Sequence, residues 1–332
     1  MSKKFKKLTS IILILAIVVI SMTACSKDEL TKIKLMEVTH SLFYTPQYVA
    51  ITQGFFEEEG LEIELINGGG ADKVMAALIS GEVDIGFMGL EASVYVYNQG
   101  RDNYAVNFAQ LTQTDGSFLV AREKDDNFTF DKLKGKTIIG GRKGGMPEMT
   151  LEYVLKSHGL DLEKDVTVRT DIQFDAMAGA FLAGEGDYVT LFEPVAASLE
   201  KEGKAYVVAS IGEAAGYIPY TGYSTTKEYM ENNEDIIQRF TNALYKAMVW
   251  VENSSTEEIA KAVKPQFPDT DDDILITLVD RYRSQDSWKP DLLITKEGLN
   301  HLMDIMELAG ELDKRADYEK IVNTKFVENA MK

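Results

Sequence analysis

The sequence predicts an α/β fold, in which mostly parallel sheets are covered by helices on both faces and a helical tail follows. The first observation is that short apolar runs alternate with segments of helical periodicity up to about residue 225. The second is that only helical patterns follow that residue. The third is size, because 332 residues with 45% hydrophobic side chains suffice for two compact domains.

The expected strands are apolar runs bounded by turn residues, and the expected helices carry apolar residues at helical spacing. Strands are expected at residues 33–38, 61–66, 83–87, 104–111, 117–122, 137–139, 166–169, 188–192 and 205–209. Helices between them are expected at residues 46–53, 71–79, 91–98, 147–157, 174–182 and 195–202. The tail is expected to form helices at residues 227–253, 256–263, 271–285 and 295–308.

The first 25 residues resemble an export signal. Four lysines between positions 3 and 7 precede an apolar run at residues 11–20, which is shorter than the roughly 20 residues that a membrane-spanning helix needs. The run is followed by Met22-Thr23-Ala24-Cys25, which resembles the lipobox of bacterial lipoprotein precursors. We therefore predict a signal peptide at residues 1–24, an acylated Cys25 and a tether at residues 25–31. The alternative is an ordinary signal peptide with an incidental cysteine.

Composition excludes several classes of function. The formal charge is −18, so the surface repels phosphate backbones and nucleic acid is not expected as a partner. Cys25 is the one cysteine of the sequence, so the chain can form neither an internal disulfide nor a CxxC site. Neither an HExxH pair nor a G-x-S-x-G elbow occurs. We expect no metal, no cofactor and no catalytic residues.

The histidines are far apart in the sequence. His158 is expected to cap the end of a helix and His301 to lie on a solvated helix face. His40 ends the first predicted strand, where a binding loop would lie, but a histidine without a positioned nucleophile is weak evidence for catalysis.

Glycine-rich turns precede three predicted helices, at residues 67–70, 88–89 and 140–145. In an open α/β sheet the ligand crevice lies outside the carboxyl ends of the strands, where helix N-termini present free N–H groups. These turns therefore favour a small polar or anionic ligand, although glycines also serve simply to make tight turns. The third loop is not a nucleotide-binding P-loop, because Gly145 is followed by Met146 rather than by Lys and Ser or Thr.

Three groups of residues then carry a resemblance to a known family. They are Tyr48-Val49-Ala50-x3-Gly54-Phe55-Phe56-x3-Gly60-Leu61, Leu78-x2-Gly81-x2-Asp84-Ile85-Gly86, and Leu133-Lys134-Gly135-Lys136 before Gly140. Together they resemble the nitrate/sulfonate/taurine and thiamine-pyrimidine-precursor substrate-binding proteins of ABC importers, over residues 33–332. Phe55 and Phe56 are expected to be core anchors rather than ligand contacts.

The resemblance implies a two-lobed type II periplasmic-binding fold that closes on its ligand like a clamshell. We place the two crossings between the lobes near residues 112–117 and 216–222. Lobe one is then residues 32–114 plus 221–332, and lobe two is residues 115–220. The aromatic residues near the second crossing could stack on a planar ligand or fill the seam between the lobes; these are Tyr217, Tyr220 and Tyr223, with Pro219 among them.

Candidate ligand contacts come from the loops that this fold brings to the cleft. They are Ser41, Tyr44, Gly69, Gly89, Leu90, Glu91, Arg142, Lys143, Gly144, Phe192, Glu193 and Tyr220. Glu193 is expected to accept hydrogen bonds from a ligand amine, and the Arg142-Lys143 pair to hold an anionic group at the other end of the same ligand. The alternatives are that Glu193 complements the dipole of the helix that follows it, or pairs with Arg142 and Lys143.

We therefore expect a monomeric, lipid-anchored, extracytoplasmic binding protein that delivers a small ligand to an ABC permease and its ATPase. A small zwitterion or sulfonate such as taurine is the favoured ligand class, and an amino-pyrimidine or related heteroaromatic is the alternative. A pyrimidine-precursor biosynthetic enzyme on the same fold is the first alternative, but that branch of the resemblance depends on a cysteine-rich segment that this sequence lacks. A ligand-sensing domain of a signalling system is the second.

Replacing Cys25 by Ala should release the protein from membranes or leave it unprocessed, because the lipoprotein cysteine carries the acyl chains. Membrane fractionation combined with the mass of the mature chain measures both effects. Fully processed Cys25→Ala protein in the membrane fraction would contradict the lipoprotein assignment.

Overall fold

The computed structural model describes residues 29–332. The predicted signal peptide, Cys25 and the first part of the predicted tether lie outside the described residues. Thr31, which was assigned to the tether, is the first residue of strand β1. Residues 32–332 form one compact unit, and the description below concerns this unit.

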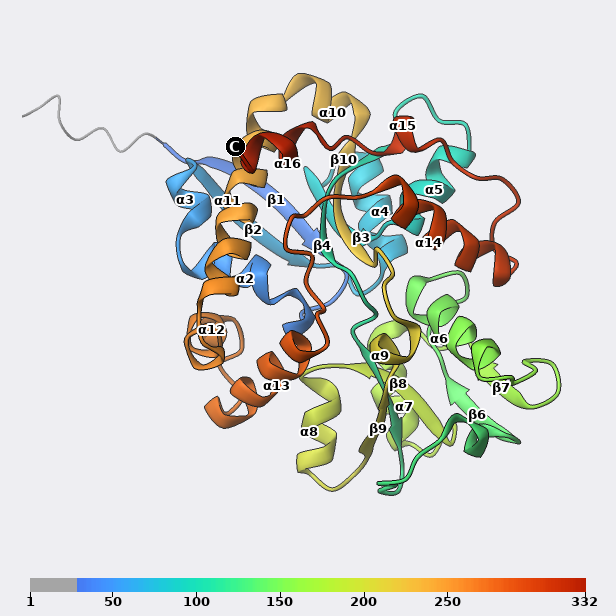
Figure 1. Cartoon of the computed structure of the whole chain (residues 1–332). Helices are drawn as coiled ribbons and strands as arrows, with labels where there is room; N and C mark the ends of the chain where they lie inside the picture. Colours follow the sequence, from blue (N-terminus) through green and yellow to red (C-terminus); the bar gives the residue numbers. More distant parts are fainter. Residues whose placement is uncertain (1–28) are drawn as a thin grey trace, which may run out of the picture. The chain divides into compact units, whose positions relative to one another are not determined.

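The unit contains two five-stranded sheets (Figure 1). The first has the order β2-β1-β3-β10-β4, formed by β1 (Thr31–Glu37), β2 (Leu61–Asn67), β3 (Ile85–Gly89), β4 (Ala105–Thr112) and β10 (Thr221–Thr226). The second has the order β7-β6-β8-β5-β9, formed by β5 (Ser117–Ala121), β6 (Lys136–Ile139), β7 (Val166–Arg169), β8 (Tyr188–Phe192) and β9 (Tyr206–Ser210). We call the bodies around these sheets lobe one and lobe two. The predicted α/β fold with two lobes is confirmed.

The sheets are mixed rather than mostly parallel. β10 was not predicted as a strand, and it runs antiparallel to both β3 and β4. β5 likewise runs antiparallel to both β8 and β9. Both strands follow a crossing from the other lobe, so each enters its sheet at the edge where the parallel strands end and must run in the opposite direction. The crossings therefore explain why the prediction of parallel sheets was only partly correct.

Helices cover both sheets. Between the strands lie α2 (Thr45–Thr52), α3 (Phe55–Glu58), α4 (Ala71–Ser80), α5 (Glu91–Asn98), α6 (Met146–Ser157), α7 (Met177–Leu182), α8 (Val195–Lys201) and α9 (Ile211–Ala215). The tail contains α10 (Lys227–Asn232), α11 (Glu234–Asn253), α12 (Thr256–Val263), α13 (Asp272–Ser284), α14 (Lys296–Leu308), α15 (Tyr318–Ile321) and α16 (Lys325–Ala330). Most expected helices are present, but the helix predicted at 227–253 is two helices, because Asn233 leaves helical geometry. Residues 174–176, predicted to begin a helix, form the 3-10 turn η3 (Phe174–Ala176).

The tail packs mainly on lobe one. The long helix α11 contacts α2, α3 and α16 (Figure 1). Phe56 from α3 is buried with its ring centre 4.9 Å from that of Phe240 in α11, which confirms its predicted role as a core anchor. Helix α14 also contacts α6 of lobe two, so the tail touches both lobes.

The two crossings pair with each other and with a third segment that the sequence did not reveal. The Ile218 N–H donates to the Gln113 carbonyl at 2.9 Å, which joins the second crossing to the first. The Gln113 N–H donates to the Ser287 carbonyl at 2.9 Å, and the Lys289 N–H donates to the Leu111 carbonyl at 2.8 Å. The segment between α13 and α14 therefore lies along the first crossing. These backbone bonds make a three-stranded hinge between the sheets.

Gly116→Ala should lower the free energy of unfolding by about 1 to 3 kcal/mol, because overpacking a filled core has this effect. A Cβ atom at Gly116 would come within 2.4 Å of the buried Phe43 ring. Gly179→Ala in α7 is the matched control: a Cβ atom there meets nothing within 4 Å, so the change should stabilise by about 0.5 to 1 kcal/mol. Urea unfolding of both variants tests this, and equal stabilities would contradict the packing at the hinge.

Candidate functional site

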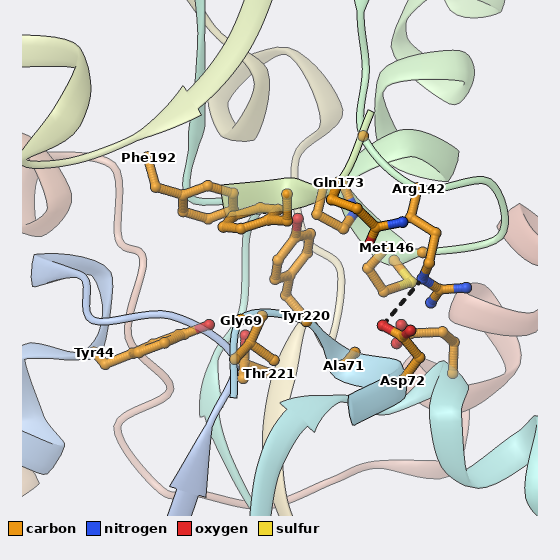
Figure 2. A pocket seen from close by; sticks show the side chains of 18 residues that line it. Tyr44, Gly69, Ala71, Asp72, Arg142, Met146, Gln173, Phe192, Tyr220 and Thr221 are labelled. Atoms are coloured by element: carbon orange, nitrogen blue, oxygen red, sulfur yellow. Dashed lines mark ion pairs between the residues drawn. The ribbon is translucent and has the colours of Figure 1, made fainter. Parts of the chain in front are cut away.

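A cavity lies between the two sheets, at the edge where their parallel strands end (Figure 2). It is lined by Val38, Tyr44, Gly69, Gly70, Ala71, Asp72, Gly89, Glu91, Gly141, Arg142, Gly145, Met146, Pro147, Gln173, Phe174, Phe192, Tyr220 and Thr221. These residues come from the segments that follow β1, β2, β6 and β7, from the ends of β3 and β8, from the starts of α4, α5 and α6, and from the second crossing. Both lobes therefore contribute, which is the arrangement expected where a ligand binds at strand ends.

Aromatic side chains form much of the wall. Phe174 and Phe192 of lobe two lie with their ring centres 5.6 Å apart. Tyr44 follows β1 in the 3-10 turn η1 (Leu42–Tyr44) and packs edge-on against Phe87, with ring centres 4.5 Å apart. Tyr220 lies between the lobes in Figure 2 and is almost fully buried. The cavity thus offers aromatic surfaces from lobe one, lobe two and the crossing.

The tyrosines near the second crossing lie in three different environments. Tyr220 lines the cavity. Tyr223 is buried inside lobe one, where its ring stacks on Phe87 with centres 4.3 Å apart, and Tyr217 is 42% exposed. Of the three, Tyr220 is therefore the one in a position to touch a ligand.

Glu91 brings a carboxyl group to the cavity from the first turn of α5. Glu91 is 1% exposed, and its Oε2 atom has no hydrogen-bond partner among the described residues. Burial raises the pKa of Glu91 to about 7, although the positive charge of Arg142 acts in the opposite direction. A Cβ atom at position 89 would lie 2.0 Å from this Oε2, so Gly89 leaves the space that the carboxyl group occupies.

The glycine-rich loop 140–145 of lobe two contacts lobe one and the tail through side chains. Arg142 Nε lies 3.5 Å from Asp72 Oδ1, the pair marked in Figure 2. Lys143 Nζ lies 3.3 Å from Glu311 Oε1, and the Tyr95 hydroxyl donates to the Gly144 carbonyl at 3.0 Å. The two cations proposed for an anionic ligand group therefore each have a carboxylate partner on the tail or on lobe one.

Other predicted contacts lie beside the cavity rather than on its wall. The Ser41 hydroxyl donates to the Glu193 carbonyl at 2.6 Å and so links the lobes. Leu90 is fully buried in the core. Lys143 and Gly144 contact lobe one and the tail as described above, and none of these residues lines the cavity.

Glu193 has partners other than those predicted. It is fully buried, forms an ion pair with Arg281 of α13 and accepts a hydrogen bond from the Ala197 N–H in the first turn of α8 at 2.8 Å. It lies outside the cavity described above but lines a neighbouring one, which shares Gly69, Phe174 and Phe192 with it and is also lined by Ser41. The alternative in which Glu193 pairs with Arg142 or Lys143 is wrong, because all three side chains have other partners. This geometry corresponds to the helix-terminal alternative, with a cation supplied from a distant part of the sequence.

The histidines take structural positions. His158 ends α6 with its Nδ1 2.8 Å from the Val154 carbonyl oxygen, which confirms its predicted capping role. His40 Nδ1 lies 2.8 Å from Glu37 Oε1, and its ring stacks on Phe267. His301 is half-buried with its ring centre 6.1 Å from that of Tyr153. Among residues 29–332, no group of three or more His, Cys, Asp or Glu residues could hold a metal ion.

Several lining residues were missed by the sequence reasoning: Val38, Asp72, Met146, Gln173, Phe174 and Thr221. Met146 directly follows a glycine-rich loop that was singled out, and Gln173 and Phe174 follow the end of a predicted strand. Position at strand ends could therefore have identified these three. Thr221 begins the strand that was not predicted.

No helix in residues 29–332 is both long enough and apolar enough to cross a membrane.

The two sheets, with a cavity between them, correspond to the two-lobed fold of periplasmic binding proteins. Solved structures of such proteins have the same fold. The alkanesulfonate-binding protein SsuA from Xanthomonas axonopodis pv. citri has a TM-score of 0.71 at 18% identity, covering 89% of this chain and 99% of that one. The nitrate-binding protein NrtA from Synechocystis PCC 6803 has a TM-score of 0.71 at 15% identity, covering 91% and 88%. These identities establish the fold alone.

The chain belongs to the NMT1/THI5-like family, whose model matches residues 43–257. It is 48% identical over 309 residues to "Putative binding protein YtlA" of Bacillus subtilis (strain 168), covering 93% of this chain and 92% of that protein. It is also 28% identical over 129 residues to a 4-amino-5-hydroxymethyl-2-methylpyrimidine phosphate synthase of Aspergillus parasiticus, but this match covers 38% of this chain and 36% of the synthase. The predicted family resemblance is confirmed.

Arg281→Ala should lower the free energy of unfolding by about 3 kcal/mol, because it leaves the fully buried Glu193 carboxylate without its charged partner. Glu193→Gln leaves the Arg281 guanidinium, which is 26% exposed, and should lower stability by a smaller amount. Glu234→Gln is the control, since it breaks an exposed ion pair with Lys325 and should change stability by less than about 0.5 kcal/mol. Urea unfolding measures the three variants. If Glu193→Gln is as stable as Glu234→Gln, the structural role given to the buried pair is incorrect.

Proposed function

We propose that this protein is the extracytoplasmic solute-binding component of an ABC importer and that it binds a small planar heteroaromatic molecule carrying an amine. In this proposal the protein is a monomer, is anchored through Cys25, delivers its ligand to a permease and performs no chemistry. The observation that carries the proposal is the interlobe cavity, which has aromatic walls and a buried carboxyl group, Glu91, whose Oε2 atom has no hydrogen-bond partner among the described residues.

The charges at the cavity support an amine-bearing ligand over a sulfonate. Arg142 is the one basic side chain on its wall among the described residues, and Asp72 already pairs with it. Glu91 adds a second carboxyl group at the same cavity. An anion placed there would meet a buried carboxyl group, whereas an amine would find an acceptor. Aromatic rings on several sides also suit a flat ligand better than a short aliphatic one such as taurine.

The relatives support the same assignment. The relative that matches along almost its whole length is described as a binding protein, and the partial relatives are named for a 4-amino-5-hydroxymethyl-2-methylpyrimidine phosphate. A role as the corresponding enzyme is less well supported. The sequence has no cysteine-rich segment, and His40 is held by Glu37 and by the Gln266 carbonyl.

Binding would act by shifting the balance between open and closed arrangements of the two lobes. A ligand that touches Tyr44 of lobe one and Phe192 of lobe two gains both contacts when the lobes are together. Closure would also bring Arg142 to Asp72 and Lys143 to Glu311. The closed form would then be the one presented to the permease.

Thermal unfolding of the purified protein with candidate ligands tests the ligand class. A ligand at a hundredfold excess over its dissociation constant adds about 2.7 kcal/mol to the stability of the native state. We expect 4-amino-5-hydroxymethyl-2-methylpyrimidine to raise the melting temperature, and taurine, an unsubstituted alkanesulfonate and nitrate to leave it unchanged. Stabilisation by a sulfonate or nitrate but not by the pyrimidine would overturn the proposed ligand class.

A further inference from the structure

We infer that Glu91 is the residue that selects for an amine on the ligand: its carboxylate accepts a hydrogen bond from the exocyclic amine of a planar heteroaromatic molecule in the interlobe cavity. This inference deepens the proposed function and depends on it. It assigns the amine to Glu91, at the end of a lobe-one strand, instead of to Glu193, at the end of a lobe-two strand.

The Glu91 Oε2 atom is buried and has no hydrogen-bond partner among residues 29–332. A carboxyl oxygen that is removed from water and left without a hydrogen bond is unfavourable, so native structures provide such atoms with a partner. The Glu91 Oε2 atom lacks one within residues 29–332, and the residue lines the cavity with 1% of its surface exposed. The N–H donor of a molecule that enters the cavity would supply this atom with a partner.

The neighbouring charges do not supply that donor. Arg142 forms its ion pair with Asp72, whose side chain is half exposed. The buried Glu148 accepts a hydrogen bond from the Gly144 N–H at 3.1 Å. Glu193 is paired with Arg281. Of the carboxylates named here, Glu91 alone both lines the cavity and has an oxygen without a partner in the described part of the chain.

The local backbone leaves room for this carboxyl group. Glu91 begins α5 directly after β3, and its side chain folds back over Gly89, where any other residue would collide with it. Gly89 and Tyr44 line the same cavity. Tyr44 packs on Phe87, which precedes Gly89 by two positions in β3, so the acceptor and an aromatic surface are supplied by neighbouring parts of lobe one. This combination suits a ring that carries an amine in its plane.

If Glu91 binds the amine, ligand binding changes the protonation of Glu91. A purely structural role for Glu91 would not produce this change. With a pKa of about 7, the group is present in both forms near neutral pH, and an amine donor favours the ionised form. Binding should therefore release a fraction of a proton at pH 7. Other ionisable groups surround the carboxyl, so the release is assigned by its loss in Glu91→Gln; these groups are Tyr44, Asp72, Tyr95, Arg142, Glu148 and Tyr220.

The test uses two probes that differ in the amine alone, 4-amino-5-hydroxymethyl-2-methylpyrimidine and 5-hydroxymethyl-2-methylpyrimidine. Calorimetry in two buffers of different ionisation enthalpy gives affinity and proton release for the full protein, Glu91→Gln, Glu91→Met and the surface control Glu234→Gln. The full protein and the control should bind the amine-bearing probe about 10- to 150-fold more tightly, as expected for a charge-assisted hydrogen bond. Glu91→Gln should lose most of this preference and the proton release, and Glu91→Met should lose both entirely.

The outcomes separate this inference from the proposed function. Both Glu91 variants should unfold at the same or a higher urea concentration than the full protein, because they remove a buried ionisable group that has one oxygen without a partner among the described residues. Loss of the amine preference in such folded variants supports the inference. An unchanged preference in Glu91→Gln and Glu91→Met overturns the inference and leaves the proposed function standing. Failure of the full protein to bind either probe overturns the proposed ligand class and, with it, this assignment.

Discussion

The backbone hydrogen bonds of the hinge determine the geometry on which the rest of the molecule depends. The first crossing is held at Gln113 between the second crossing and the segment that follows α13. Because both crossings leave and enter their sheets at the carboxyl ends of the parallel strands, these ends of the two lobes face each other. The loops after β1, β3 and β8 and the starts of α4, α5 and α6 then surround one cavity. The same geometry forces β5 and β10 to run antiparallel to their neighbours.

Two of the ion pairs that join the lobes beside the cavity are weak. The Arg142–Asp72 and Lys143–Glu311 pairs are partly or largely exposed, and such pairs contribute about 0 to 1 kcal/mol each. The buried Glu193–Arg281 pair is different, because Glu193 is inaccessible to water and breaking the pair is strongly destabilising. This buried pair joins Glu193 of lobe two to Arg281 of the tail, so it also holds the lobes together. Ligand contacts to both lobes add to these interactions and favour the closed arrangement.

Local sequence patterns predicted most of the fold and part of the site. Strand ends followed by small residues correctly indicated Gly69, Gly89, Glu91 and Arg142 as neighbours of one cavity. The strand at 221–226 was missed because its residues, Thr-Gly-Tyr-Ser-Thr-Thr, are polar and lack alternation although all are buried. The partner of Glu193 could not be predicted, since Arg281 comes from a helix 88 positions away that reaches lobe two through tertiary packing. Local patterns identify which loops meet, whereas the pairing of charges depends on distant elements.

The distance between the two rims of the cavity tests most directly whether the two lobes close on a ligand. Lys73 of α4 and Asp175 of η3 are exposed on opposite lobes, and both approach Gly69: a Cβ atom there would lie 3.4 Å from Lys73 Nζ and 3.7 Å from Asp175 Oδ2. Spin labels on Lys73→Cys and Asp175→Cys, with Cys25 replaced by Ser, report this separation by pulsed electron paramagnetic resonance. If the lobes close on the ligand, the distance distribution is short and narrow with saturating 4-amino-5-hydroxymethyl-2-methylpyrimidine, and it is longer and broader without it. Identical distributions with and without the bound pyrimidine would contradict a ligand site between two closing lobes.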